Sequence, residues 1–106
     1  MNVVIIGDRA LIGPSLHALT NVHPIDPSLR LGTLGIELHR PVTIGNDVWI
    51  GGNVTLLPGV TIGNGCTIGA GSVVTNSTGE RDVWYGNPAR MMRKVGDKED
   101  RINWKE

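Results

Sequence analysis

An all-β solenoid, in which short strands wind into stacked coils, is predicted by three features of this 106-residue sequence. The first is a run of aliphatic residues at a constant spacing of six, and the second is a glycine directly after most of them. The third is a composition without phenylalanine, so that Ile, Val and Leu, which suit strands, must fill the core. A chain of this length forms one domain.

The repeat defines which residues should face the core. The aliphatic positions are Ile44, Ile50, Leu56, Ile62, Ile68 and Val74. The fifth position of the same units holds small or β-branched residues, namely Val48, Val54, Val60, Cys66 and Ser72. A period of six is a multiple of two but not of 3.6, so strand alternation places both positions on one face, whereas a helix would scatter them. Stacked coils then bury a column that no single repeat can bury alone.

A long excursion interrupts the coil. The same unit occurs earlier, at Ile6 and Ile12, but the 32 residues from Ile12 to Ile44 are not a multiple of six, so residues 17–41 must leave the coil. Long loops in compact domains are usually functional or disordered, and we interpret this one as the active-site loop. It collects the ionisable residues His17, His23, Asp26, Arg30, Glu37 and His39.

The coil is expected to end near residue 88, so that residues 1–88 form the coiled domain and residues 89–106 a tail. The pattern lapses after Val74, and a last apolar piece at Trp84 and Tyr85 should close the final turn. From Ala89 onward the residues are good helix formers with mixed charge, so we expect a short C-terminal helix with Trp104 as its apolar anchor.

Composition argues against several classes of partner. Ten basic and ten acidic residues cancel, which removes the general electrostatic case for nucleic acid or an anionic membrane. A single cysteine makes no internal disulfide, and no spaced Cys/His pairs suggest a metal site. We therefore expect no metal, no targeting segment, no membrane span and a reducing cytoplasm as the location.

Several motifs go beyond the plain repeat. They are His23-Pro24-Ile25-Asp26-Pro27 and the segments 41–51, 58–63, 68–75 and 86–90. With these motifs the chain resembles the hexapeptide-repeat acyltransferases, and the His-Pro loop resembles their maltose, galactoside and nodulation-type sugar O-acetyltransferases. The resemblance covers most of residues 1–93. It implies a left-handed, LpxA-like parallel β-helix and a homotrimer with acetyl-CoA bound between adjacent subunits.

The resemblance also implies a catalytic residue. Moving an acetyl group from a thioester to a sugar-like hydroxyl requires removal of the hydroxyl proton, and a neutral imidazole has a suitable pKa for this near pH 7. His23 matches the catalytic histidine of the family. His17 and His39 match no catalytic position and are interpreted as exposed or locally hydrogen-bonded. Cys66 should be buried and unreactive, which favours direct transfer over an acyl-cysteine.

Residues that meet acetyl-CoA are likewise implied by the resemblance. Small residues would let main-chain amides approach the pantetheine arm, an exposed indole would border the cleft, and two arginines would meet the nucleotide phosphates. The matching positions are Trp49, Gly52, Ala70, Thr75, Arg90 and Arg93.

Two other functions are carried as alternatives. A non-catalytic trimeric scaffold is one, because family members carry an N-terminal segment with acceptor-binding groups; we expect this chain to be a form truncated at its N-terminus, with low or absent activity alone. A zinc enzyme similar to γ-type carbonic anhydrases is the other, suggested by the three histidines. All three histidines lie in or beside one excursion, which argues against that zinc site.

Overall fold

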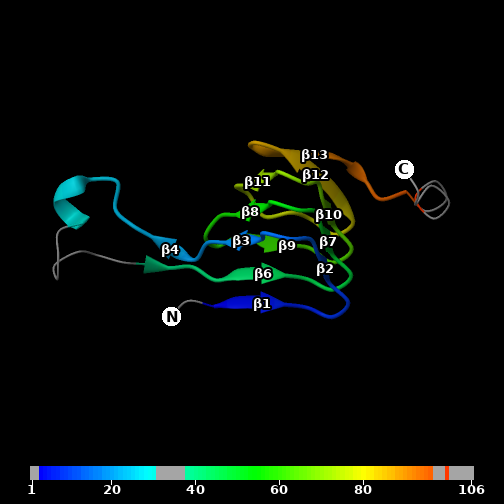
Figure 1. The fold of residues 1–106 in the computed structure, drawn as a ribbon, viewed down its shortest axis with the longest axis horizontal. Coiled ribbons are helices and arrows are strands. Elements are labelled where there is room, and N and C mark those ends of the chain that lie inside the picture. The colour runs from blue at the N-terminus through cyan, green and yellow to red at the C-terminus, as the bar shows by residue number, and fades with distance from the viewer. Residues whose placement is uncertain (1–2, 31–37, 97–99, 101–106) are drawn as a thin grey trace.

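The computed structural model describes residues 3–30, 38–96 and 100, and it confirms the predicted coil (Figure 1). Three parallel sheets form the sides of the stack. Sheet A contains β1 (Val4–Ile6), β6 (Val42–Ile44) and β9 (Thr61–Ile62). Sheet B contains β2 (Leu11–Ile12), β7 (Trp49–Ile50), β10 (Thr67–Ile68), β12 (Asp82–Gly86) and β13 (Ala89–Lys94). Sheet C contains β3 (His17–Ala18), β8 (Thr55–Leu56) and β11 (Val73–Val74).

Three hexapeptides make one coil. Ile44 pairs with Ile62, and Ile50 pairs with Ile68, which is eighteen residues later in both cases. Each coil strand of the three sheets, from β1 to β11, ends after two or three residues because the chain must bend at a corner before it enters the next sheet. Parallel pairing with the coil above and below then satisfies the backbone groups of such short strands.

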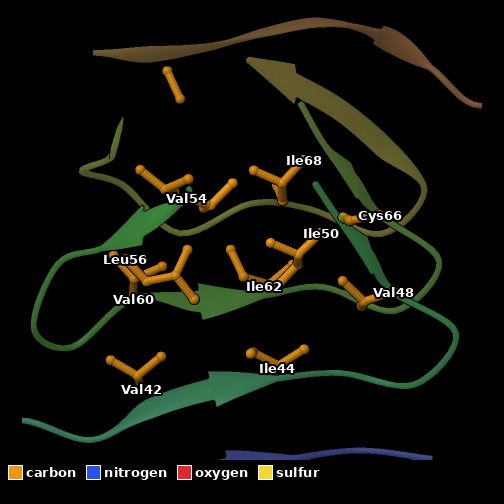
Figure 2. Packing of buried hydrophobic residues seen from close by; sticks show 12 residues of the cluster. Val42, Ile44, Val48, Ile50, Val54, Leu56, Val60, Ile62, Cys66 and Ile68 are labelled. Atoms are coloured by element: carbon orange, nitrogen blue, oxygen red, sulfur yellow. The ribbon is translucent and has the colours of Figure 1, made fainter. Parts of the chain in front are cut away.

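The core consists of the side chains that the repeat predicts. All eleven predicted inward positions from Ile44 to Val74 are no more than 3% exposed. Figure 2 shows these aliphatic side chains pointing into the coil, together with Val42, which is also fully buried. Ser72 is the polar member of the set, and its hydroxyl donates to the Gly69 carbonyl at 2.6 Å and accepts from the Gly86 amide at 3.1 Å. The buried column therefore carries no unpaired hydroxyl.

The excursion leaves the coil later than residue 17. His17–Ala18 still pairs with β8, and the Leu19 amide donates to the Leu56 carbonyl at 3.0 Å. The boundary predicted at residue 17 was therefore too early, because Ala18, six residues after Ile12, still takes the repeat position opposite Leu56. Beyond this point β4 (Asn21–Val22) and β5 (Leu38–His39) pair antiparallel, and a 3₁₀ helix η1 (Pro27–Arg30) lies near the far end of the excursion.

The C-terminal segment differs from the prediction. Ala89–Lys94 is strand β13, antiparallel to β12, so the helix expected from residue 89 is wrong over these residues. Gly86 has a φ of +114°, a backbone conformation that suits glycine and reverses the chain into a hairpin. Pairing with β12 outweighs the helix propensity of this segment. The rest of the expected helix, including Trp104, lies outside the described residues.

The two ends of the stack differ. At one end β12 and β13 cover the last coil, whereas at the other end β1, β2 and β3 are edge strands. The inward-facing residues Val4, Ile6 and Ile12 of this first coil are 43%, 49% and 37% exposed. None of the described helices is long and apolar enough to span a membrane.

Asp82 fastens the β12–β13 hairpin to the coil. Its buried carboxylate accepts from the Gly79 amide at 2.8 Å and from the Trp84 indole at 3.0 Å, and it lies 2.5 Å from the Lys94 ammonium. Burial raises the pKa of Asp82, but the hydrogen bonds and the charge of Lys94 outweigh burial, so its pKa lies below the ordinary value. The ionised form is therefore the one that the cap holds.

Replacing Asp82 by Asn should lower the free energy of unfolding at pH 7 by about 1–3 kcal/mol, because a buried charged acceptor is lost. Because the pKa of Asp82 is lowered in the folded chain, its ionised form stabilises the fold fully above the ordinary carboxyl pKa near 4. This stabilisation disappears as the pH falls through the pKa that Asp82 has in the folded chain. The difference between wild type and Asp82→Asn should therefore shrink in acid. Urea unfolding from pH 7 to pH 3 measures it. Asp47→Asn, at an exposed pair with Arg9, is the control and should change little.

Two adjacent glycines should respond differently to alanine. A Cβ on Gly51 would lie 2.7 Å from the Ala70 nitrogen and 2.9 Å from its Cα, whereas a Cβ on Gly52 would lie 3.6 Å from its nearest neighbour, Pro14. We expect Gly51→Ala to lower the free energy of unfolding by about 1–3 kcal/mol because backbone must shift. Gly52→Ala should stay within about 0.5 kcal/mol. Equal losses in urea unfolding at fixed protein concentration would contradict this account of the corner.

Candidate active site

His23 stands at the start of the excursion, immediately after β4. Its side chain is exposed, and the following Pro24 restricts its backbone. Strands β4 and β5 form the neck of the excursion, which projects away from the coil in Figure 1. The sequence-predicted base is therefore carried by a segment outside the rigid stack.

Asp26 organises the excursion beyond His23. Its Oδ1 accepts from the Ser28 amide at 2.9 Å and from the Ser28 hydroxyl at 2.8 Å, at the start of η1. These hydrogen bonds, the amide bond foremost, lower the pKa of Asp26. Within the described part of the chain Asp26 makes no ion pair with Arg30, so its support of the loop is a local turn. Glu37 lies outside the described residues.

A strip of small residues follows the corner between sheets B and C. Successive coils cross this corner at residues 13–15, 51–53 and 69–71. The Asn53 amide donates to the Pro14 carbonyl and the Gly71 amide donates to the Gly52 carbonyl, each at 2.9 Å, so the corners stack directly. Gly52 and Ala70, two predicted ligand contacts, both lie on this strip. Little side-chain bulk separates its main chain from solvent.

Trp49 borders the same strip. It lies on β7, two residues before the corner, and its side chain is 58% exposed, as the sequence predicts for an outward position. Its direct neighbour on β2 is Leu11, which is 68% exposed. Two large apolar side chains in register on an outer sheet face form a surface that favours contact with a ligand or another chain.

The two predicted arginines lie on the cap. Arg90 and Arg93 are exposed on β13, and Arg90 Nη1 donates to the Ala89 carbonyl at 3.3 Å. Both terminal nitrogens of Arg93 donate to Asp100, at 2.8 and 2.9 Å. These bonds, with one from the Gly96 amide, lower the pKa of Asp100 to about 2. A planar guanidinium that binds a carboxylate in this manner also has the geometry for a phosphate.

The predicted residues fall into three groups in a single chain, of which Arg90 and Arg93 on the cap are one. Trp49, Gly52 and Ala70 share the corner between sheets B and C. His23 leaves from the opposite side of sheet C, on the edge where Thr75 follows β11 (Figure 1). One chain therefore does not bring the candidate base to the candidate groove.

One contact in this region was missed from the sequence. Asn21 and His39 lie opposite each other on β4 and β5, and His39 Nδ1 is 3.0 Å from Asn21 Oδ1. Eighteen residues separate them in the chain, and only the pairing of the two ends of the excursion brings them together. Within the described residues no three His, Cys, Asp or Glu side chains converge into a metal-binding group.

The chain is similar to known proteins in sequence and in fold. Residues 41–76 match the family described as bacterial transferase hexapeptide (six repeats). Galactoside O-acetyltransferase of Escherichia coli is 41% identical over 103 residues, which are 97% of this chain and 50% of that protein.

Two solved structures are also similar. A maltose O-acetyltransferase from Clostridium difficile aligns with a TM-score of 0.82 and 46% identity, over 89% of this chain and 49% of that one. A galactoside acetyltransferase in complex with coenzyme A aligns with a TM-score of 0.88 and 41% identity, over 97% of this chain and 50% of that one. The chain spans about half the length of the curated relatives that it matches.

Proposed function

Because the chain belongs to the hexapeptide-repeat acyltransferases, we propose that it forms the catalytic coil of an acetyl-CoA-dependent O-acetyltransferase acting on a sugar-like hydroxyl. The observation that carries this proposal is the strip of small residues at Gly52 and Ala70, which stacks backbone amides beside exposed Trp49. A related structure that aligns over 97% of this chain holds coenzyme A. The family resemblance implies a left-handed coil, and the single cysteine favours a reducing cytoplasm as the location.

In this proposal His23 is the general base. Its neutral imidazole takes the proton of the acceptor hydroxyl while the hydroxyl oxygen attacks the thioester carbonyl carbon. The new C–O bond forms, the C–S bond breaks, and the thiolate of coenzyme A leaves and takes up a proton. Cys66 is buried, and its thiol donates to the Gly79 carbonyl at 2.7 Å, so it is unavailable as a nucleophile. Transfer is therefore direct.

In this proposal the groove binds the pantetheine arm of acetyl-CoA, and the cap binds its nucleotide phosphates. Gly52 and Ala70 leave room for the pantetheine arm against the main chain, and Trp49 borders it. Thr75 lies nearer the loop, while Arg90 and Arg93 on the cap supply charge for the nucleotide phosphates. Asp100 holds the Arg93 guanidinium in the free chain, and a nucleotide phosphate would take the place of this carboxylate as its partner.

The separation of His23 from the groove supports a site built from two subunits. Each subunit of a homotrimer would place its excursion against the corner of a neighbour, which brings the base of one chain to the strip of the next. The exposed pair of Leu11 and Trp49 supplies apolar surface on the same side as the strip.

A non-catalytic trimeric scaffold is the second candidate function, because the exposed apolar pair of Leu11 and Trp49 would also suit a contact between subunits. Binding of acetyl-CoA distinguishes the two, because a scaffold has no need for the groove or the arginines. The zinc alternative has no supporting group among the described residues.

Replacing His23 by Ala should lower kcat/KM for acetyl transfer to maltose or methyl β-galactoside by about 100-fold to 10,000-fold, the usual contribution of a general base. The affinity for acetyl-CoA should stay near the wild-type value, since the imidazole acts on the acceptor. Release of free thiol measures the rate, and calorimetry measures binding. Unchanged transfer in His23→Ala would show that another group removes the proton. Binding of acetyl-CoA without any transfer would favour the scaffold.

Mixing two inactive variants tests the shared site. His23→Ala removes the base, and Ala70→Trp blocks the groove, so each homotrimer alone should be inactive. After the two are refolded together in equal amounts, about a quarter of sites would pair an intact loop with an intact groove if these come from different subunits. Thiol release should recover accordingly. A mixture as inactive as its components would place loop and groove of one site on the same chain.

A further inference from the structure

We propose that Asn21 and His39 form a clasp at the neck of the excursion that positions His23, an inference that rests on the proposed function of His23 as base. Neither residue would touch the reacting atoms. Their role is to fix the backbone from which the base projects.

The contacts place the clasp where the excursion leaves the coil. Asn21 pairs directly with His39 across β4 and β5, and Val22 pairs with Leu38. The next backbone bond toward the coil runs from the Arg40 amide to the Thr20 carbonyl, at 2.8 Å. The side-chain contact of 3.0 Å between His39 Nδ1 and Asn21 Oδ1 therefore reinforces the antiparallel ladder.

The hydrogen bond to Asn21 Oδ1 determines which nitrogen of the His39 imidazole carries a proton. A carboxamide oxygen only accepts hydrogen bonds, so with Asn21 Oδ1 as the acceptor His39 Nδ1 carries the proton. This defines a donor and an acceptor that can be exchanged between the two positions in an experiment.

The register of β4 decides where His23 points. Strand β4 ends at Val22, and His23 follows it directly, so the pairing of β4 sets the direction in which the chain enters His23. A slip of one residue would exchange the two faces of β4 and so redirect the chain at His23. Each strand contains only two residues, so backbone pairing alone specifies this register weakly. The side-chain bond selects the register in which Asn21 faces His39.

Exposure limits the size of the effect. Both side chains of the clasp are exposed, and cross-strand polar pairs of this kind contribute modestly. The clasp should therefore change the fraction of molecules with a correctly placed base, while the coil and the groove remain as they are. A change in kcat at constant KM for acetyl-CoA is the signature that separates positioning from a general loss of folding.

The test compares His39→Ala and Asn21→Ala with the wild-type chain. We expect kcat for acetyl transfer to maltose or methyl β-galactoside to fall about twofold to fivefold in each variant, with KM for acetyl-CoA unchanged. Hydrogen exchange in peptides that cover the neck should speed up in the same variants. His17→Ala is the matched control, because this exposed histidine lies on β3 of the coil, and its kcat should equal that of wild type.

An exchange variant makes the test specific. Combining Asn21→His with His39→Asn swaps donor and acceptor across the same pair of positions, and we expect kcat to return close to the wild-type value. A loss in the single variants that the exchange does not repair would overturn the clasp, as would an unchanged kcat in His39→Ala. If the wild-type chain transfers no acetyl group, the proposed function fails and takes this role with it. If the wild-type chain is active and His39→Ala leaves kcat unchanged, the clasp is overturned and the proposed function stands.

Discussion

The close stacking of successive coils is the constraint on which this structure depends. Neighbouring strands lie about 4.8 Å apart, so at each corner the main chain of one coil passes directly over that of the next. A side chain at Gly51 would meet the Ala70 backbone at 2.7 Å, which leaves only glycine there. The aliphatic column is buried because these corners allow the coils to approach. Glycine spacing and core spacing are therefore two consequences of one geometry.

The same constraint creates the candidate groove. Residues that are kept small for stacking leave the corner between sheets B and C with exposed main chain and little side-chain cover. Gly52 shows that the two requirements are separable, since a Cβ there would meet nothing closer than 3.6 Å. Its small size is not needed for folding and is consistent with a ligand that approaches the backbone. Packing demands glycine at residue 51, whereas binding favours it at residue 52.

The sequence predicted the coil well because its signals are local and repeated. Each inward position from Ile44 to Val74 could be read from a period of six, and all are buried. The tail was mispredicted because residues 89–94 have helix propensity, and only pairing with β12 across Gly86 makes them a strand. For the site, the exposure of Trp49 followed from its outward position in the repeat, whereas Gly52 and Ala70 were implied by the family resemblance. The Asn21–His39 contact followed from neither, because it depends on where a long excursion closes.

The coil positions the candidate groove more firmly than the excursion positions the candidate base. The groove lies on a stack in which every coil fixes its neighbours, whereas His23 follows a strand of two residues at the neck of a projecting segment. General base catalysis requires the imidazole within hydrogen-bonding reach of the acceptor hydroxyl. Because the excursion projects away from its own coil, His23 is positioned by the neck on one side and, in the proposed trimer, by a neighbouring subunit on the other. A base carried on such a segment is therefore set by contacts at both ends rather than by the rigid repeat that defines the fold.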